Sequence, residues 1–207
     1  MSDNRRKSEW NGRYGASKVW TGKVNTHVSA WVSAHPAQGG DVAIDLACGE
    51  GGDAIWLASQ GYSVSGVDFA ETAIARAAVA AASAGVDVDW HVSDVTAWRP
   101  RDTADLVSLS FFHEHEALRK AAWRAAGALV SGSGTLLIAG HAPDAEDAPG
   151  PPSHTRFTAD DVVEELGPDW ASVVSLVERP GVGGHVGHVM SDVVIAFTRV
   201  SVMRGLA

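Results

Sequence analysis

The sequence predicts a single-domain α/β protein built on a mostly parallel sheet that ends in an antiparallel hairpin. Three observations support this fold class. From about Asp41 onward, short apolar runs alternate with helical patterns, which is typical of βαβ units. Two late β-like runs have no helix between them and can form a hairpin. The length of 207 residues suits one domain with a substantial core.

The alternating part of the chain contains five predicted strands and three long helices. The strands are expected at residues 42–47, 62–67, 86–92, 104–110 and 135–139. The helices are expected at residues 51–60, 70–84 and 114–130, the last ended by the Ser/Gly run 131–134. Ala54, Leu57 and Ala58 lie at the i, i+3, i+4 spacing of one helix face. Gly61 and Gly85 are placed as helix terminators.

The last third of the chain predicts a loop, a helix and the hairpin. Residues 144–153 are acidic and rich in proline, which indicates a loop. Thr158 is placed to cap a helix that continues to about Leu166, with acidic residues in its first turn. The strand-like runs 172–177 and 189–200 are separated by a Gly/His loop at 181–188.

Composition and charge exclude several classes of protein. A net charge of −9 argues against nucleic-acid binding, and the basic run 5–7 lies at a terminus that we expect to be solvated. No apolar stretch reaches 18 residues, and no apolar segment follows the N-terminal charges, so neither membrane insertion nor secretion is expected. The lone Cys48 suits a reducing cytoplasm. The oligomeric state is left open between monomer and homodimer.

A glycine-rich turn follows the first predicted strand, where open α/β sheets bind ligands. Gly49 and Gly51 allow the backbone to approach a ligand at points where a Cβ atom would collide. Asp45 places a carboxylate beside the turn, where it can receive an ammonium group but would repel a pyrophosphate. Cys48 lies inside the turn and is interpreted as a packing residue.

Acidic residues also follow the second and third strands. Asp68 lies 19 residues after Gly49, the spacing at which a carboxylate reaches the hydroxyl pair of a ribose. Asp94 follows the third strand, where it can accept from an adenine amino group. Phe69 can cover the adenine face. Each signal has a common structural explanation, a turn or a helix cap, but the three occur in order at strand ends.

The run from about 41 to 140 resembles class I S-adenosylmethionine (SAM) dependent methyltransferases. It is closest to the small-molecule branch of tellurite-resistance and thiopurine methyltransferases, through residues 45–58 and 61–69. The resemblance implies a seven-stranded Rossmann-like sheet with helices on both faces and an antiparallel last strand. It also implies SAM as cofactor and S-adenosylhomocysteine (SAH) as product. The resemblance implies cofactor contacts from Gly49, Gly51, Asp68, Asp94 and Val95.

Two further positions complete the cofactor side. Ala47 stands where many members of the family carry the first glycine of the turn, and it is tolerated if its φ stays negative. Ser110, which ends the fourth strand, is also counted among the cofactor-contacting candidates.

Residues 1–35 resemble the N-terminal cap that closes over cofactor and substrate in this branch. Tyr14 and Trp20 can face a sulfonium cation, and Arg13 can hold the methionine carboxylate. Packing of an amphipathic helix on the sheet is the alternative, and we prefer it for Trp31. The single domain is thus divided into a lid (1–35), a cofactor-binding core (41–140) and an acceptor-side region (141–207).

Histidines supply candidate groups on the acceptor side. His113 follows the fourth strand, His141 the fifth, and His185 and His188 lie before the last. A neutral imidazole can take a proton from an attacking nucleophile, so His188, His113 and Tyr14 are the catalytic candidates. The spacing of His113 and His115 also occurs in metal sites, but no metal is expected. The tellurite-resistance enzymes that the chain resembles carry an arginine beside the histidine that corresponds to His188, whereas this chain has valines there. Arg156 and Arg179 are the candidates to replace that arginine.

The sequence therefore predicts direct in-line methyl transfer to a small-molecule nucleophile: a thiol, a chalcogen oxyanion, an amine or a phenol. Two alternatives remain open. A non-catalytic regulator would keep the SAM or SAH site without an acceptor pocket. An NAD(P)-dependent oxidoreductase would share the sheet, although Asp45, Asp94 and the terminal hairpin argue against it.

Overall fold

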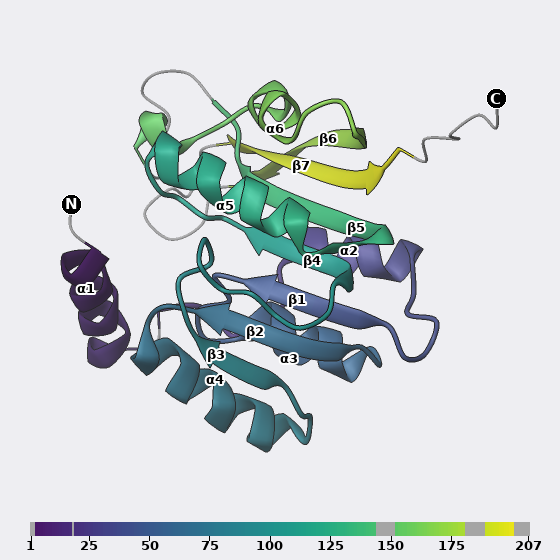
Figure 1. Cartoon of the computed structure of the whole chain (residues 1–207). Helices are drawn as coiled ribbons and strands as arrows, with labels where there is room; N and C mark the ends of the chain where they lie inside the picture. The colour runs from purple at the N-terminus through teal and green to yellow at the C-terminus, as the bar shows by residue number, and fades with distance from the viewer. Residues whose placement is uncertain (1–2, 18, 144–151, 181–188, 201–207) are drawn as a thin grey trace.

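A seven-stranded sheet forms the centre of the molecule (Figure 1). The computed structural model describes residues 3–17, 19–143, 152–180 and 189–200. Across the sheet the strand order is β3-β2-β1-β4-β5-β7-β6. The strands are β1 (Val42–Leu46), β2 (Ser63–Asp68), β3 (Asp89–Val92), β4 (Ala104–Ser110), β5 (Val130–His141), β6 (Trp170–Pro180) and β7 (Val189–Arg199).

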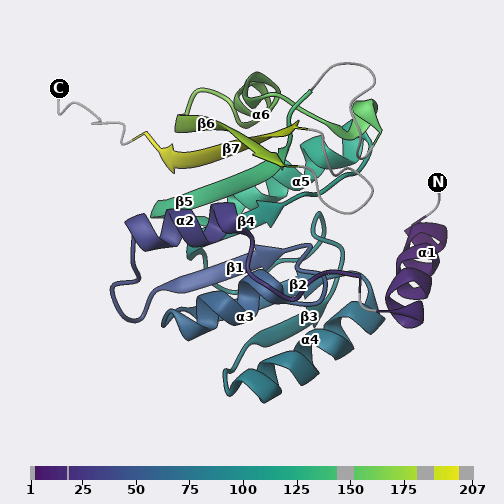
Figure 2. The ribbon, with the colours of Figure 1, turned by 180° about the vertical axis from the view of Figure 1, so that it is seen from behind.

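Helices cover both faces of this sheet, as Figures 1 and 2 show from opposite sides. Helices α5 and α6 lie on one face, and α2 and α3 on the other, while α1 stands apart beside one end of α4. The helices are α1 (Asp3–Ala16), α2 (Thr26–Ala34), α3 (Gly52–Ser59), α4 (Glu71–Ala84), α5 (Glu116–Ala128) and α6 (Ala159–Leu166).

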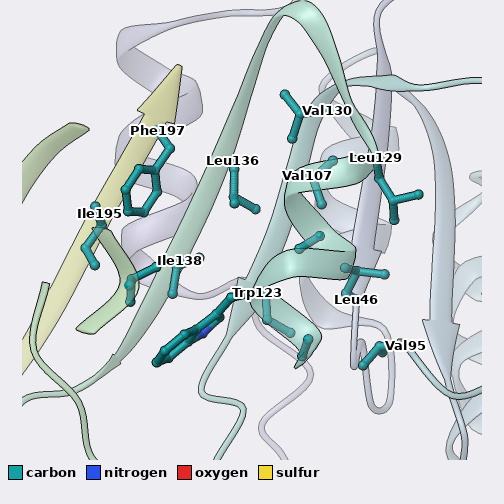
Figure 3. Packing of buried hydrophobic residues seen from close by; sticks show 14 of the residues in the cluster. Leu46, Val95, Val107, Trp123, Leu129, Val130, Leu136, Ile138, Ile195 and Phe197 are labelled. Carbon is teal, nitrogen blue, oxygen red and sulfur yellow. The ribbon is translucent and has the colours of Figure 1, made fainter. Parts of the chain in front are cut away.

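Alternation along the buried strands gives one core cluster on each face of the sheet. On the α5 side, Trp123 is inserted among Leu46, Ile138 and other aliphatic side chains (Figure 3). On the α2 and α3 side, Ala43 of the same strand β1 packs with residues such as Leu57. Successive strand residues point to opposite faces, so a strand buried on both faces is mostly apolar.

The predicted ending of the sheet is confirmed. Strand β7, the last in the sequence, runs antiparallel to both β5 and β6 and lies between them, while β1 to β5 pair in parallel. The seven-stranded, mostly parallel sheet is therefore the expected one. The predicted cap of α6 is also present, because Thr158 and Asp161 form a reciprocal capping box.

The boundary between α5 and β5 differs from the prediction. Helix α5 ends at Ala128, and the Ser/Gly run 131–134, expected to be a terminator outside any strand, belongs to β5. Val130 pairs with Ala104, after which the register shifts before Thr135 pairs with Leu106. A Cβ atom on Gly134 would lie 2.6 Å from the Ala104 carbonyl oxygen, so glycine allows this close strand approach.

Strand β3 is shorter than predicted, because the residues after α4 complete the end of that helix. Gly85 takes a left-handed conformation, and its amide donates to the carbonyl of Ala82. The amide of Val86 donates to the carbonyl of Ala81, which completes a Schellman motif. The run of alternating apolar and polar residues that starts at Val86 therefore enters the sheet only at Asp89.

The N-terminal region forms two helices instead of one cap helix. Helix α2 packs Val28 and Val32 into the core, and Trp31 packs against the same cluster, as we preferred. Helix α1 contacts α4 instead of the sheet. In the described part of the chain, no helix is long and apolar enough to cross a membrane.

Candidate functional site

A cavity of about 330 Å³ lies at the carboxyl ends of β1, β2 and β4, covered by α1 and by residues 20–25. This volume lies within the range of small-molecule sites, about 300–1,000 Å³. Nine of the predicted site residues line it: Tyr14, Trp20, Asp45, Ala47, Gly49, Asp68, Phe69, Ser110 and His113.

Asp45 is the most deeply buried carboxylate of the cavity. Its Oδ1 accepts a 2.9 Å hydrogen bond from the Ser108 hydroxyl, whereas its Oδ2 is buried with no hydrogen-bond partner. Burial and, secondarily, the nearby Asp53 raise the pKa of Asp45 well above its usual value. A buried carboxylate oxygen with no donor is a feature that a ligand cation, such as an ammonium group, would satisfy.

The glycine turn has a left-handed backbone at three positions: Ala47, Gly49 and Gly51. Gly49 and Gly51 have φ of 53° and 80°, and a Cβ on Gly51 would lie 2.5 Å from the ring of Trp90. A Cβ on Gly49 would lie 3.0 Å from the Tyr14 hydroxyl oxygen. Gly51 itself does not line the cavity, so it shapes the turn from behind.

Ala47 departs from the expectation for this turn. Its φ is +54°, not negative as the sequence analysis required for alanine. The fold thus imposes the conformation that glycine would adopt there without strain. Phe111 is the other non-glycine residue with positive φ among those described, and it also lines the cavity. Both positions lie where a strand of the sheet ends, β1 and β4, and backbone strain of this kind tends to gather at functional sites.

Asp68 already holds two backbone amides. Its Oδ2 accepts from the Gly49 amide at 2.9 Å and its Oδ1 from the Ala70 amide at 2.8 Å. The carboxylate therefore joins the glycine turn to the residue that precedes α4, and it still lines the cavity. Burial raises its pKa. A carboxylate has about four acceptor positions, so these contacts leave capacity for ligand hydroxyls.

The predicted adenine side is occupied by α1. Arg6 donates to Asp94 Oδ2 at 2.8 Å and lies over the Phe69 ring at 5.1 Å. The other oxygen of Asp94 accepts from the amide and hydroxyl of Thr96. Val95 is buried in the core. Neither Asp94 nor Val95 lines the cavity, in contrast to Phe69.

The segment around Trp20, part of the predicted lid, is tied to the glycine turn by Glu50, a contact that the sequence did not predict. Glu50 Oε2 accepts from the amides of Val19 and Trp20, at 3.0 and 2.9 Å. Its Oε1 accepts from Arg76 of α4 at 2.9 Å. Burial opposes the charge, but these hydrogen bonds, that of the Trp20 amide foremost, lower the pKa of Glu50. Only its position inside the turn could have drawn attention to it.

Tyr14 closes the cavity above Gly49. Its hydroxyl accepts from the Trp20 indole at 3.2 Å, and its ring stacks on Trp10. Burial, with smaller effects from nearby carboxylates, raises the pKa of Tyr14 to about 12, so the phenol is neutral near pH 7. Arg13 lies elsewhere: it is exposed, packs over Trp10 and does not line the cavity.

On the predicted acceptor side, Phe111 and His113 are among the residues that line the cavity. His113 stacks on His141 with 4.8 Å between ring centroids, and its Nε2 is buried with no hydrogen-bond partner. Burial and the neighbouring His141 lower the pKa of His113 to about 4, which keeps the imidazole neutral at pH 7.

Several candidates lie elsewhere or outside the described residues. His185 and His188 belong to residues 181–188, which the structure does not describe. Cys48 is held neutral near pH 7, because burial raises the pKa of its thiol well above the usual value. Arg156 is buried but does not line the cavity. Within the described ranges, no group of three or more His, Cys, Asp or Glu side chains is placed to hold a metal ion.

Comparison with known proteins is consistent with this architecture. Residues 43–134 match the model of a family described as a methyltransferase domain. No curated protein sequence matches the chain.

Solved structures with the same fold include two methyltransferases and the protein TehB. Magnesium protoporphyrin IX methyltransferase (ChlM) from Synechocystis PCC 6803 with bound SAM has a TM-score of 0.72 and 17% identity, over 96% of this chain and 98% of that chain. The N-methyltransferase NodS from Bradyrhizobium japonicum WM9 with SAH has a TM-score of 0.69 and 16% identity, over 94% and 98%. TehB from Haemophilus influenzae has a TM-score of 0.68 and 17% identity, over 86% and 63%.

These findings define the class of protein. The likeness to solved structures, at such identities, shows the predicted Rossmann-like methyltransferase fold. The match of residues 43–134 to a methyltransferase domain agrees with the predicted class, a SAM-dependent methyltransferase. The predicted cofactor agrees with the SAM and SAH bound in those structures.

Proposed function

We propose that this protein transfers a methyl group from SAM to a small-molecule nucleophile by direct in-line displacement. The observation that carries the proposal is the buried, partnerless Oδ2 of Asp45 in the cavity at the end of β1. The ammonium group of the donor's amino-acid portion would satisfy it. When bound, SAM supplies an electrophilic methyl group on a sulfonium ion. The protein therefore has to align the donor with the nucleophile and to exclude water.

The residues of the cavity support roles for both ends of the donor. Asp68 has remaining acceptor capacity for ribose hydroxyls, and Gly49 leaves room that any side chain would fill. Tyr14 and Trp20 offer aromatic rings and a neutral phenol oxygen near a cation. An adenine stacked on Phe69 and held by Asp94 requires Arg6 to move aside or to lie over the base.

The finer identity of the enzyme remains a proposal from the sequence. Membership of the tellurite-resistance and thiopurine branch rests on the residues quoted above, and the fold of TehB is compatible with it. The lid, core and acceptor-side division is kept, with the lid now formed by α1 and the segment around Trp20 that Glu50 holds. A cytoplasmic location, a monomeric or homodimeric state and the lack of a nucleic-acid partner are kept as predictions.

Calorimetry with SAH tests the donor site. We expect wild-type binding, and a loss of about 10- to 100-fold in affinity for Asp45→Asn, since a charged hydrogen bond contributes about 1.5–3 kcal/mol. Asp105→Asn is the matched control, because Asp105 accepts from the Val42 amide at the opposite end of the sheet. Equal losses in both variants, or no binding of SAH by the wild type, would refute the proposal.

A methyl-transfer assay separates the enzyme from its alternatives. Labelled SAM is offered with tellurite, selenite, small thiols, amines and phenols as acceptors. Turnover of one acceptor class supports the enzyme. SAH binding without turnover favours a regulator, and binding of NADH with quenched tryptophan fluorescence favours an oxidoreductase.

A further inference from the structure

Two imidazole rings and a buried carboxylate lie behind the acceptor-side wall of the cavity. Asp192 of β7 is completely buried. Its Oδ2 lies 3.0 Å from Nε2 of His27 on α2, and its Oδ1 lies 2.7 Å from Nδ1 of His141 at the end of β5. Both histidines are themselves buried. We call Asp192, His27 and His141 the Asp192 cluster.

The two contacts determine where the imidazole hydrogens lie. A carboxylate only accepts hydrogen bonds, so His27 carries a hydrogen on Nε2 and His141 on Nδ1. The same contacts fix the planes of both rings. A buried carboxylate that orients an imidazole in this way is a recurring arrangement behind reactive groups.

The Asp192 cluster touches the cavity through two of its lining residues. Phe111 stacks against His27 at 6.2 Å between centroids and meets His141 edge-on at 4.9 Å. His113 lies flat on His141, with an angle of 11° between the rings. Phe111 also holds a left-handed backbone, which persists only where surrounding contacts enforce it.

His113, which stacks on the Asp192 cluster, is placed to contact a ligand in the cavity. It lines the cavity, its Nε2 has no hydrogen-bond partner, and burial holds its pKa near 4. The charges that act on it are those of Asp192, His141, Arg119 and Arg156. A neutral imidazole with an unsatisfied nitrogen accepts a hydrogen bond from an N–H, O–H or S–H group.

The charge of the cavity restricts the acceptor further. Its ionisable lining, apart from His113, Tyr14 and Cys48, consists of one lysine and five carboxylic acids. These residues are Lys23 and Asp45, Glu50, Asp53, Asp68 and Glu114. An oxyanion entering this site would meet mainly carboxylic groups and a single lysine, whereas a neutral nucleophile carries no charge for those groups to repel.

We propose that the Asp192 cluster is a positioning device that holds His113 and Phe111 as the acceptor-binding wall, and that the acceptor is a neutral nucleophile whose hydrogen faces His113. This rests on the proposed methyl transfer. The acceptor atom forms a bond to the methyl carbon while the carbon–sulfur bond breaks and its electron pair goes to sulfur. The hydrogen passes as a proton to His113 Nε2 and then to water. Asp192 acts through His141 and is a positioning residue.

The first test uses the protein without cofactor or acceptor. Imidazole ¹⁵N shifts of histidine-labelled protein report tautomer and protonation, with signals assigned by single His→Gln variants. At pH 7 we expect neutral His113, with the hydrogen on Nδ1 of His141 and Nε2 of His27. Asp192→Asn should change the His141 and His113 signals, whereas Asp105→Asn should not. A protonated His113 at pH 7, or His113 signals unchanged in Asp192→Asn, would overturn the proposal.

The second test measures turnover and SAH binding on the same variants. Neutral probes are dithiothreitol, catechol and aniline, and anionic probes are selenite and tellurite. We expect turnover only of neutral probes, with kcat reduced about 10- to 100-fold in Asp192→Asn and SAH affinity within about twofold of wild type. Wild-type kcat in Asp192→Asn, or turnover of the oxyanions alone, would overturn this inference. Failure of the wild type to bind SAH would overturn the proposed function instead, while the ¹⁵N result would still judge the cluster.

Discussion

Replacement of Ala47 by glycine should relieve strain in the ligand-binding turn. Ala47 has φ of +54°, in the region where the Cβ of an L-residue crowds the following carbonyl. Glycine has no Cβ and adopts this conformation without the clash. An alanine-to-glycine change in a folded protein usually lowers stability, so the sign of the effect is diagnostic.

The magnitude follows from two opposing contributions. Left-handed conformation costs an alanine about 1–2 kcal/mol. Glycine adds freedom to the unfolded chain worth about 0.4–1 kcal/mol, and the half-buried methyl group of Ala47 is lost as well. On balance, we therefore expect the free energy of unfolding of Ala47→Gly to equal that of wild type or to exceed it by up to about 1 kcal/mol.

A matched substitution removes the unfolded-state contribution. Ala97 lies in the exposed turn after β3 and does not have positive φ. Ala97→Gly should lose about 0.4–1 kcal/mol. The two variants should thus differ by about 1–2 kcal/mol in urea unfolding without ligand, or by about 2–8 °C in Tm. Equal losses in both variants would refute the assignment of strain to Ala47.

Three other perturbations test the lid, the histidine and the turn. Glu50→Gln should speed hydrogen exchange at the amides of Val19 and Trp20 about tenfold or more, because charged hydrogen bonds contribute about 1.5–3 kcal/mol. Unchanged exchange would argue against a role of Glu50 in holding this segment. His113 has a folded pKa of about 4, below 6.5, so the unfolded chain takes up the proton first as pH falls. The free energy of unfolding should therefore fall progressively as the pH drops from 6.5 to about 4, by up to about 3 kcal/mol in total. In urea unfolding at a series of pH values, His113→Asn should flatten this part of the profile. Gly51→Ala should cost about 2–4 kcal/mol in the same assay, since its Cβ would lie 2.5 Å from Trp90 at φ +80°; a loss under 1 kcal/mol would contradict the close packing.

The sequence was most informative where structure depends on local pattern. Short apolar runs alternating with helical periodicity determined the order of strands and helices, and the absence of a helix before β7 indicated the antiparallel ending. Because parallel strands carry their carboxyl ends to one edge, Asp45 and Asp68 could be placed in one site from spacing alone. Errors fell at element ends, as at Val130, where pairing with β4 outweighs the Ser/Gly signal.

Contacts between distant segments were decided only by the tertiary structure. The hydrogen bonds from the amides of Val19 and Trp20 to Glu50 span 31 and 30 positions of the sequence. The contact between Arg6 and Asp94 spans 88 positions. His27 and Asp192 lie 165 positions apart, so no pattern in the sequence links them. Which ionisable groups meet, and therefore their pKa values, depends on burial and partners that only packing supplies.

The sequence by itself determined the class of fold, the end of the sheet at which the cavity lies and the carboxylates gathered there, because hydrophobic periodicity and turn residues act over a few positions. The tertiary structure decided the sign of φ at Ala47, the lid contacts and the histidines around Asp192. Each of these depends on the positions of segments that come together only when the core is packed, since backbone strain and buried polar contacts are held by the whole fold.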